Sequence, residues 1–257
     1  MSFTIHAFVE KQSGATKDLS KVKCNDVIYC RKTPALLFYG LADGQGHKQH
    51  GFAGGAFALH AIAEYIHEIG LSALLEFPFP DEIPFLLTQK FRSVLSSLSQ
   101  QQGYPFTEYA STVLGSAVDL ISGNYMILHL GDGCAIGLHK SHSSIILSPP
   151  ENTFSREYTW LTTSDHAAFH LRINFGNIQN FQRLVFLTDG ATSLCYGKNL
   201  SSRARQLLAD EDPHQFLNAL KRTHPHDDAS GIVLDIQFLP TTENTFDSNK
   251  TECKYET

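Results

Sequence analysis

The sequence predicts an α+β fold built in layers, with two sheets packed together and helices outside them. Three observations lead to this prediction. Two segments with helical periodicity precede residue 100, a run of short apolar segments follows them, and the connections within that run are too short for parallel crossovers. Helices segregated from antiparallel strands are typical of α+β folds. The large number of apolar strands favours two sheets over one.

The elements are expected in a definite order. Strands are predicted at 3–9, 26–30 and 35–42, then helices at 53–69 and 84–99, then strands at 111–121, 125–131, 134–138 and 143–148. Residues 149–182 receive no assignment. A strand at 183–188, helices at 199–209 and 213–222 and a last strand at 230–239 complete the chain. Gly70 suits the end of the first helix. The last helix is expected to have Asp212 as N-cap and Pro213 at its first position.

Composition limits the possible classes of function. The chain has 257 residues, of which 42% are hydrophobic and 18% charged, and its net charge of −6 does not indicate a nucleic-acid-binding surface. No apolar run approaches the roughly 18 residues of a membrane span, and the first residues do not resemble a signal peptide. Five scattered cysteines without a CxxC pair indicate reduced thiols in a cytoplasmic protein. One domain, residues 1–239, and a polar, disordered tail, residues 240–257, are expected.

Two buried strands end in the same dipeptide, Asp-Gly, at Asp43 and at Asp189. A lone Asp-Gly is usually a plain turn, but further acidic residues lie at other strand edges: Asp26, Asp132, Asp227 and Asp228. Carboxylates gathered at one edge of a sheet repel one another and need a cation, and oxygen ligands favour Mg²⁺ or Mn²⁺. A glycine after the ligand lets the backbone come close and leaves its carbonyl available.

Six segments, in order, resemble the metal-dependent protein phosphatases of type 2C, in particular a divergent bacterial branch. The segments are similar to the family's Asn-Glu-Asp strand start, Asp-Gly metal motif, Gly-Ser/Thr-Thr-Ala strand, Gly-Asp-Ser-Arg turn, Thr-Asp-Gly motif and final Asp-Asn/Asp-x-Ser/Thr motif. In this chain they read "NDVIY" (25–29), "GLADGQGHKQHG" (40–51), "LGSAVDL" (114–120), "HLGDGCAIGL" (129–138), "FLTDGATSL" (186–194) and "HDDASGIVL" (226–234). The resemblance runs from about residue 4 to residue 237.

The resemblance implies an αββα four-layer sandwich that carries two Mn²⁺ or Mg²⁺ ions and, in bacterial members, a third. The metal-binding groups implied are Asp43, the carbonyl of Gly44, Asp189 and Asp227, with Asp26 in or near the shell and Asp132 at the third ion. The implied reaction is hydrolysis of phosphoserine or phosphothreonine by a metal-bridging water. A phosphoprotein substrate, a kinase-linked signalling partner and a monomeric chain are expected with it.

The chain also departs from the family pattern. Lys21 stands five residues before Asp26, where the family has an arginine that grips phosphate, and lysine lacks the two-pronged guanidinium. His47, four residues after Asp43, is a candidate proton donor to the substrate, with a merely solvated histidine as the alternative. Residues 149–182 do not resemble the family's usual flap. A second function therefore stays open, a catalytically weak or inactive scaffold that binds a signalling partner, although the complete carboxylate set favours the enzyme.

Overall fold

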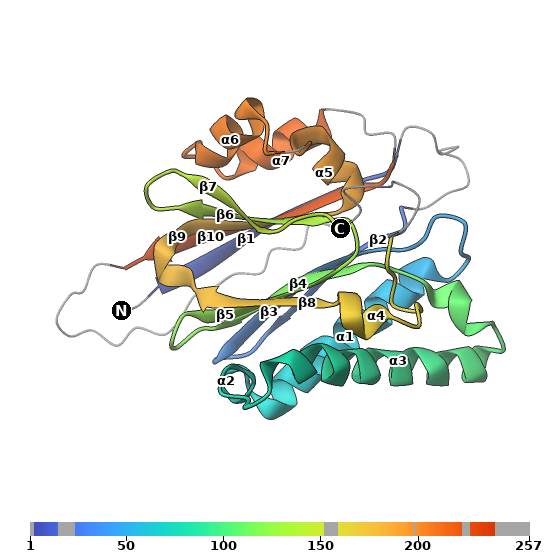
Figure 1. Ribbon diagram of the computed structural model, residues 1–257. Coiled ribbons are helices and arrows are strands. Elements are labelled where there is room, and N and C mark those ends of the chain that lie inside the picture. Colours follow the sequence, from blue (N-terminus) through green and yellow to red (C-terminus); the bar gives the residue numbers. More distant parts are fainter. Residues whose placement is uncertain (1–2, 15–23, 152–158, 198, 223–226, 240–257) are drawn as a thin grey trace.

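The computed structural model describes residues 3–14, 24–151, 159–197, 199–222 and 227–239 (Figure 1). Lys21 and the expected tail at residues 240–257 lie outside these ranges. Within them, two five-stranded sheets pack face to face, and every strand pairing is antiparallel. The short connections predict such pairing only for the run of strands at 111–148. No helix in the described ranges has the length and apolar character needed to cross a membrane.

Each sheet draws strands from distant parts of the chain. The first sheet has, in spatial order, β1 (Phe3–Gln12), β10 (Ala229–Phe238), β9 (Phe181–Leu187), β6 (Cys134–His139) and β7 (Ser144–Ser148). The second has β2 (Asp26–Lys32), β3 (Leu36–Asp43), β4 (Val113–Asp119), β5 (Asn124–Leu130) and β8 (Arg172–Asn177). The first and last of the described strands are therefore neighbours, and β1 forms one edge of the first sheet.

Helices cover the outer face of each sheet. The second sheet is covered by α1 (Gly51–Ile69), α2 (Leu71–Leu75) and α3 (Ile83–Gln102), and α4 (Ala167–His170) packs beside α3 (Figure 1). The first sheet carries α5 (Asp189–Cys195), α6 (Ser202–Ala209) and α7 (His214–Lys221). Short 3₁₀ turns lie at Pro80–Glu82, Phe106–Tyr109 and Ile178–Asn180. The four-layer αββα arrangement is thus confirmed.

Strand β3 illustrates why the apolar strands need two covered faces. Its side chains alternate: Leu37 and Leu41 lie in the core between the sheets, whereas Phe38 and Ala42 lie in the core beneath α1. Since successive side chains point to opposite faces of a sheet, a strand covered on both sides reads as a continuous apolar run. The same burial explains the apolar segments of β4, β5 and β9.

Some element boundaries differ from the sequence expectation. The unassigned region 149–182 contains α4 and β8, and β8 is an edge strand with half-buried side chains, so it lacks a clear apolar run. Helix α7 begins one residue later than expected, with Pro213 as N-cap, so the prediction of Asp212 as N-cap is wrong. The Asp212 side chain nevertheless accepts a hydrogen bond from the N–H of His214, the first residue of α7. Asp212 therefore still satisfies one backbone donor at the start of the helix.

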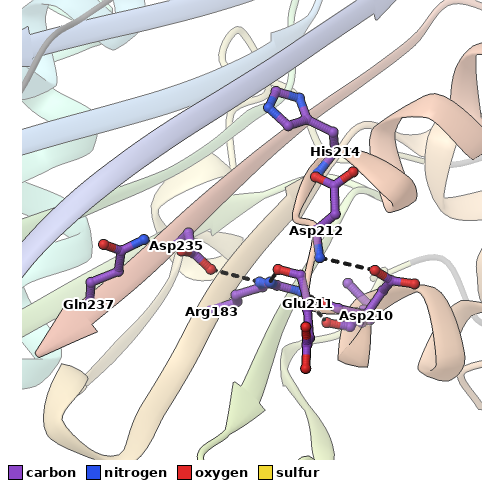
Figure 2. A network of polar contacts seen from close by, with 8 residues as sticks. Arg183, Asp210, Glu211, Asp212, His214, Asp235 and Gln237 are labelled. Carbon is purple, nitrogen blue, oxygen red and sulfur yellow. Dashed lines mark hydrogen bonds and ion pairs between the residues drawn. The ribbon is translucent and has the colours of Figure 1, made fainter.

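The largest fully buried side chain belongs to Arg183 on β9, beneath the connection from α6 to α7. Its guanidinium donates to the Asp235 carboxylate at 2.8 Å and to the backbone carbonyls of Leu208, Asp210 and Glu211 (Figure 2). The Leu208 carbonyl belongs to the last turn of α6, where helix carbonyls lack intrahelical partners, and the carbonyls of Asp210 and Glu211 follow the helix. The charge is therefore paired, and its remaining protons fasten the helical layer to the first sheet.

Candidate metal centre

The two Asp-Gly dipeptides and their neighbours meet at one end of the sandwich. Asp26 begins β2 and Asp43 ends β3, and the antiparallel register places these two residues directly opposite each other. Asp189 follows β9, Asp227 precedes β10, and β9 and β10 are also antiparallel neighbours. The acidic ends of both sheets therefore lie together, because the negative charges of Asp26, Asp189 and Asp227 all act on Asp43.

Both glycines permit a close backbone approach. A Cβ at Gly44 would lie 2.5 Å from the carbonyl carbon of Gly51 at the start of α1. A Cβ at Gly190 would lie 2.1 Å from the backbone oxygen of Asp228. Such separations do not occur between real atoms, so only glycine lets each Asp-Gly strand end touch the neighbouring segment. The repeated dipeptide thus has a structural reason in addition to the turn it makes.

The metal-free carboxyl groups resist ionisation. Desolvation raises the pKa of Asp43 well above its ordinary value, and the negative charges of Asp26 and Asp189 add to the effect. Desolvation likewise raises the pKa of Asp26 to about 6 and that of Asp189 to about 7. The ordinary value is about 3.9. Groups that are held together yet resist ionisation in this way are stabilised in the charged form by a bound cation.

Asp26 provides a direct test of whether a cation fits. Its side chain is fully buried, and one oxygen accepts a hydrogen bond from the Thr188 hydroxyl at 3.0 Å. The other oxygen, Oδ1, is buried without a hydrogen-bond partner. A buried carboxylate oxygen without a partner is costly. An oxygen-only donor set that includes such an atom fits a hard divalent ion.

The raised pKa values predict the pH dependence of apo-protein stability. Asp26 and Asp189 hold protons more tightly in the folded apo protein than in the unfolded chain. Their contribution is complete below about pH 4 and is lost as pH rises through about 6 to 7. We expect urea titrations with chelator to give an unfolding free energy that falls between about pH 5 and pH 8. A free energy that rises across this interval would contradict the carboxyl assignment.

Asp132 lies in the turn between β5 and β6, where its negative charge raises the pKa of Asp189. One oxygen of Asp132 accepts a hydrogen bond from the Thr159 hydroxyl at 2.6 Å. The turn is positioned by Gly131, whose φ of 124° is unfavourable for other residues. Arg172 donates to the carbonyls of Gly131 and Pro149, which fastens this turn to β8. Arg172 therefore serves the scaffold of the turn through these contacts.

The histidines occupy different surroundings. His47 is exposed in the turn before α1, and its part in proton transfer stays a prediction. The His50 ring packs on the rings of Tyr104 and Tyr109. The His170 ring stacks on the Trp160 ring with 3.9 Å between the ring centroids, and its Nδ1 lies 2.6 Å from Glu151 Oε1. Within the described ranges, no histidine belongs to a cluster of three possible metal ligands.

Two structural partners of the centre were not assigned roles from the sequence. Thr188 orients Asp26 through the hydrogen bond that its hydroxyl donates. It lies in the Thr-Asp-Gly segment, in which the sequence indicated a role only for the aspartate. Asp228 is buried and accepts hydrogen bonds from the N–H groups of Gly14 at 3.0 Å and Asn25 at 2.7 Å. The Asp-Asp doublet before β10 was visible in the sequence, but which aspartate faces which neighbour depends on contacts more than 200 residues apart in the chain.

A family model described as "Protein phosphatase 2C" matches residues 14–231. No curated protein sequence matches the chain significantly. Among solved structures, the serine/threonine phosphatase Stp1 from Staphylococcus aureus is 16% identical with a TM-score of 0.67, covering 93% of this chain and 97% of Stp1.

Two further solved structures were determined with metal ions. The catalytic domain of the serine/threonine protein phosphatase PstP, in complex with two manganese ions, is 13% identical with a TM-score of 0.62, covering 92% of this chain and all of that domain. RsbX in complex with magnesium is also 13% identical, with a TM-score of 0.61, and covers 91% of this chain and 96% of RsbX. At these identities the likeness shows the shared fold.

Proposed function

Because the chain belongs to the protein phosphatase 2C family, we propose that it is a metal-dependent protein phosphatase that hydrolyses phosphoserine and phosphothreonine monoesters. The observation that carries the proposal is the meeting of Asp26, Asp43, Asp189 and Asp227 from four separate segments at one end of the sandwich. Nothing in the described part of the chain favours the alternative of an inactive scaffold, since the carboxylate set is complete. A phosphoprotein substrate follows from the family.

The chain's own residues would divide the work as follows. Asp43, the Gly44 carbonyl, Asp189 and Asp227 are proposed to hold two Mg²⁺ or Mn²⁺ ions, with Asp26 beside them and Asp132 available for a third. Bound ions lower the pKa of water and offset negative charge on phosphoryl oxygens. Thr188 keeps Asp26 in place through its hydroxyl. His47 is proposed to give a proton to the leaving oxygen. A kinase-linked partner, a monomeric state and a cytoplasmic location stay predictions.

Hydrolysis is expected to require Mn²⁺ or Mg²⁺. Excess chelator should reduce turnover of a phosphopeptide or an aryl phosphate to background, and added Mn²⁺ should restore it, because the proposed ligands are all oxygen. Mn²⁺ at about 100 times its dissociation constant should also raise the unfolding free energy by about 2.7 kcal/mol. Full activity in chelator would exclude the metal mechanism. Mn²⁺-dependent stabilisation without turnover would support a metal-binding scaffold instead.

Lys21 is proposed to attract the phosphate in place of the family's arginine. Lys21→Arg should lower the KM for a phosphopeptide, because a guanidinium can bind phosphate through two hydrogen bonds. Lys21→Ala should raise KM and leave the Mn²⁺ affinity unchanged. Lys32→Ala is the matched control, since Lys32 ends β2 at the opposite end from Asp26. If both Lys21 variants keep the wild-type KM, the phosphate is held by another group.

A further inference from the structure

A thiol lies beside two of the buried carboxylates. Cys24, just before β2, has its Sγ within 4.8 Å of a carboxylate oxygen of Asp26 and one of Asp228, and those two oxygens lie within the same limit of each other. In the described ranges this is the one group of three potential metal-ligating side chains that meets this limit. Both aspartates are buried, with exposed fractions of 0% and 1%, while Cys24 is half-buried.

The oxygen atoms of this group are already oriented. Asp228 is fixed by the N–H groups of Gly14 and Asn25, one on each carboxylate oxygen. Asp26 is fixed through one oxygen by Thr188, and its other oxygen is buried without a partner. This unpartnered oxygen of Asp26 has its lone pairs available for a cation. Two oriented carboxylates, one of which has an unsatisfied buried oxygen, therefore lie close to a thiol.

The thiol changes which cation the group prefers. Thiolate sulfur is a soft ligand that selects zinc-like ions, whereas carboxylates alone suit magnesium and manganese. Zinc bonds of about 2.3 Å to sulfur and about 2.0–2.2 Å to carboxylate oxygen place two ligand atoms of a tetrahedral ion about 3.3–3.7 Å apart. The three ligand atoms lie within 4.8 Å of one another, so small side-chain rotations are enough to close the site around an ion.

We propose that Cys24, Asp26 and Asp228 form a binding site for a soft divalent cation, Zn²⁺ or Cd²⁺, beside the oxygen-only centre. Binding joins the ion to the Cys24 sulfur and releases the thiol proton to solvent, and water completes the coordination. Because Asp26 also faces Asp43 across the β2–β3 pair, an ion held at Cys24 draws on a carboxylate of the neighbouring centre. Inhibition of hydrolysis by Zn²⁺ is the expected consequence, and this consequence alone rests on the proposed phosphatase function.

Cadmium titration of the full chain in excess Mg²⁺ tests the binding directly. The sulfur-to-cadmium charge-transfer absorption in the ultraviolet should appear with wild type and disappear with Cys24→Ser, whose affinity for Cd²⁺ should fall at least about tenfold. Cys30→Ser is the matched control that should keep the absorption, since the Cys30 thiol does not belong to the group. An absent absorption in wild type, or one that persists in Cys24→Ser, overturns the proposal. The reading is independent of phosphatase turnover.

A second measurement uses only the wild-type chain, in case Cys24→Ser does not fold. Iodoacetamide labelling followed by mass spectrometry reports how accessible each thiol is. Cd²⁺ should protect Cys24 from alkylation while Cys30 reacts at an unchanged rate. Equal alkylation of Cys24 with and without Cd²⁺ would overturn the proposal, because a sulfur bound to the ion cannot be alkylated at the free rate. Mg²⁺ alone should give no protection.

Discussion

Asp189→Asn is expected to fold and to lose about 100- to 1,000-fold in turnover, the scale of one lost electrostatic contact to a transition state. The substitution keeps the shape of the side chain but removes the negative charge that meets those of Asp132 and Asp227. Steady-state hydrolysis of a phosphopeptide at saturating Mn²⁺ measures the loss. Glu68→Gln on the exposed side of α1 is the matched control, because it removes one charge away from the centre.

The same variant separates a catalytic effect from a structural one. Desolvation and neighbouring charges raise the pKa of Asp189 to about 7, so its ionised form is unfavourable in the apo protein. Asparagine removes that cost, and apo Asp189→Asn should unfold at the same or a higher urea concentration than wild type at pH 8. A turnover within about tenfold of wild type, on the order of 1.4 kcal/mol in barrier, would count against the role of Asp189.

Arg183→Met is expected to give the largest loss of stability. The methionine fills part of the buried space, but Asp235 is left as an unpaired carboxylate and three carbonyls at and beyond the end of α6 lose their donor. Breaking a buried ion pair in this way costs about 3–5 kcal/mol, against a total stability of about 5–15 kcal/mol for a typical protein. Urea unfolding monitored by circular dichroism measures the change.

Two further variants make this test specific. Arg203→Met on α6 removes an exposed arginine and should change the unfolding free energy by less than about 0.5 kcal/mol. The double variant Arg183→Met with Asp235→Leu removes both charges and should recover part of the loss, because an unpaired buried charge is the main cost. A loss below about 1 kcal/mol in Arg183→Met would show that the network contributes little.

Several features of the centre could be predicted from residues close together in the chain. The apolar runs before Asp43 and Asp189 identified β3 and β9, because a strand covered on both faces leaves a continuous apolar signature. The helical spacing of Ile62 and Ile66 identified α1 in the same way. The ordered motifs then led to the family, which the family match confirms over residues 14–231.

Features without a local signature were harder to predict. Strand β8 has no assignment from the sequence, because it lies at a sheet edge and only Ile173 and Phe175 among its six residues carry large apolar side chains. The sequence predicts that α7 begins at Pro213, one residue before its observed start at His214. Pro213 is compatible with both the cap and the first helical position. The first error concerns an edge strand without a buried residue and the second concerns an exposed helix start, and at both places packing makes weaker demands on side-chain type.

The layered α+β class, the family and the acidic strand ends can be predicted without the structure, since periodicity, turn residues and motif order are all local properties of the chain. Tertiary structure alone decided that Asp26 lies opposite Asp43 with one buried oxygen left unsatisfied, and that Asp228 binds the N–H of Asn25 across 203 positions of sequence. It also placed Cys24 beside both carboxylates. Such contacts depend on how the strands pair and how the two sheets stack, and the chemistry of the centre arises from those long-range contacts.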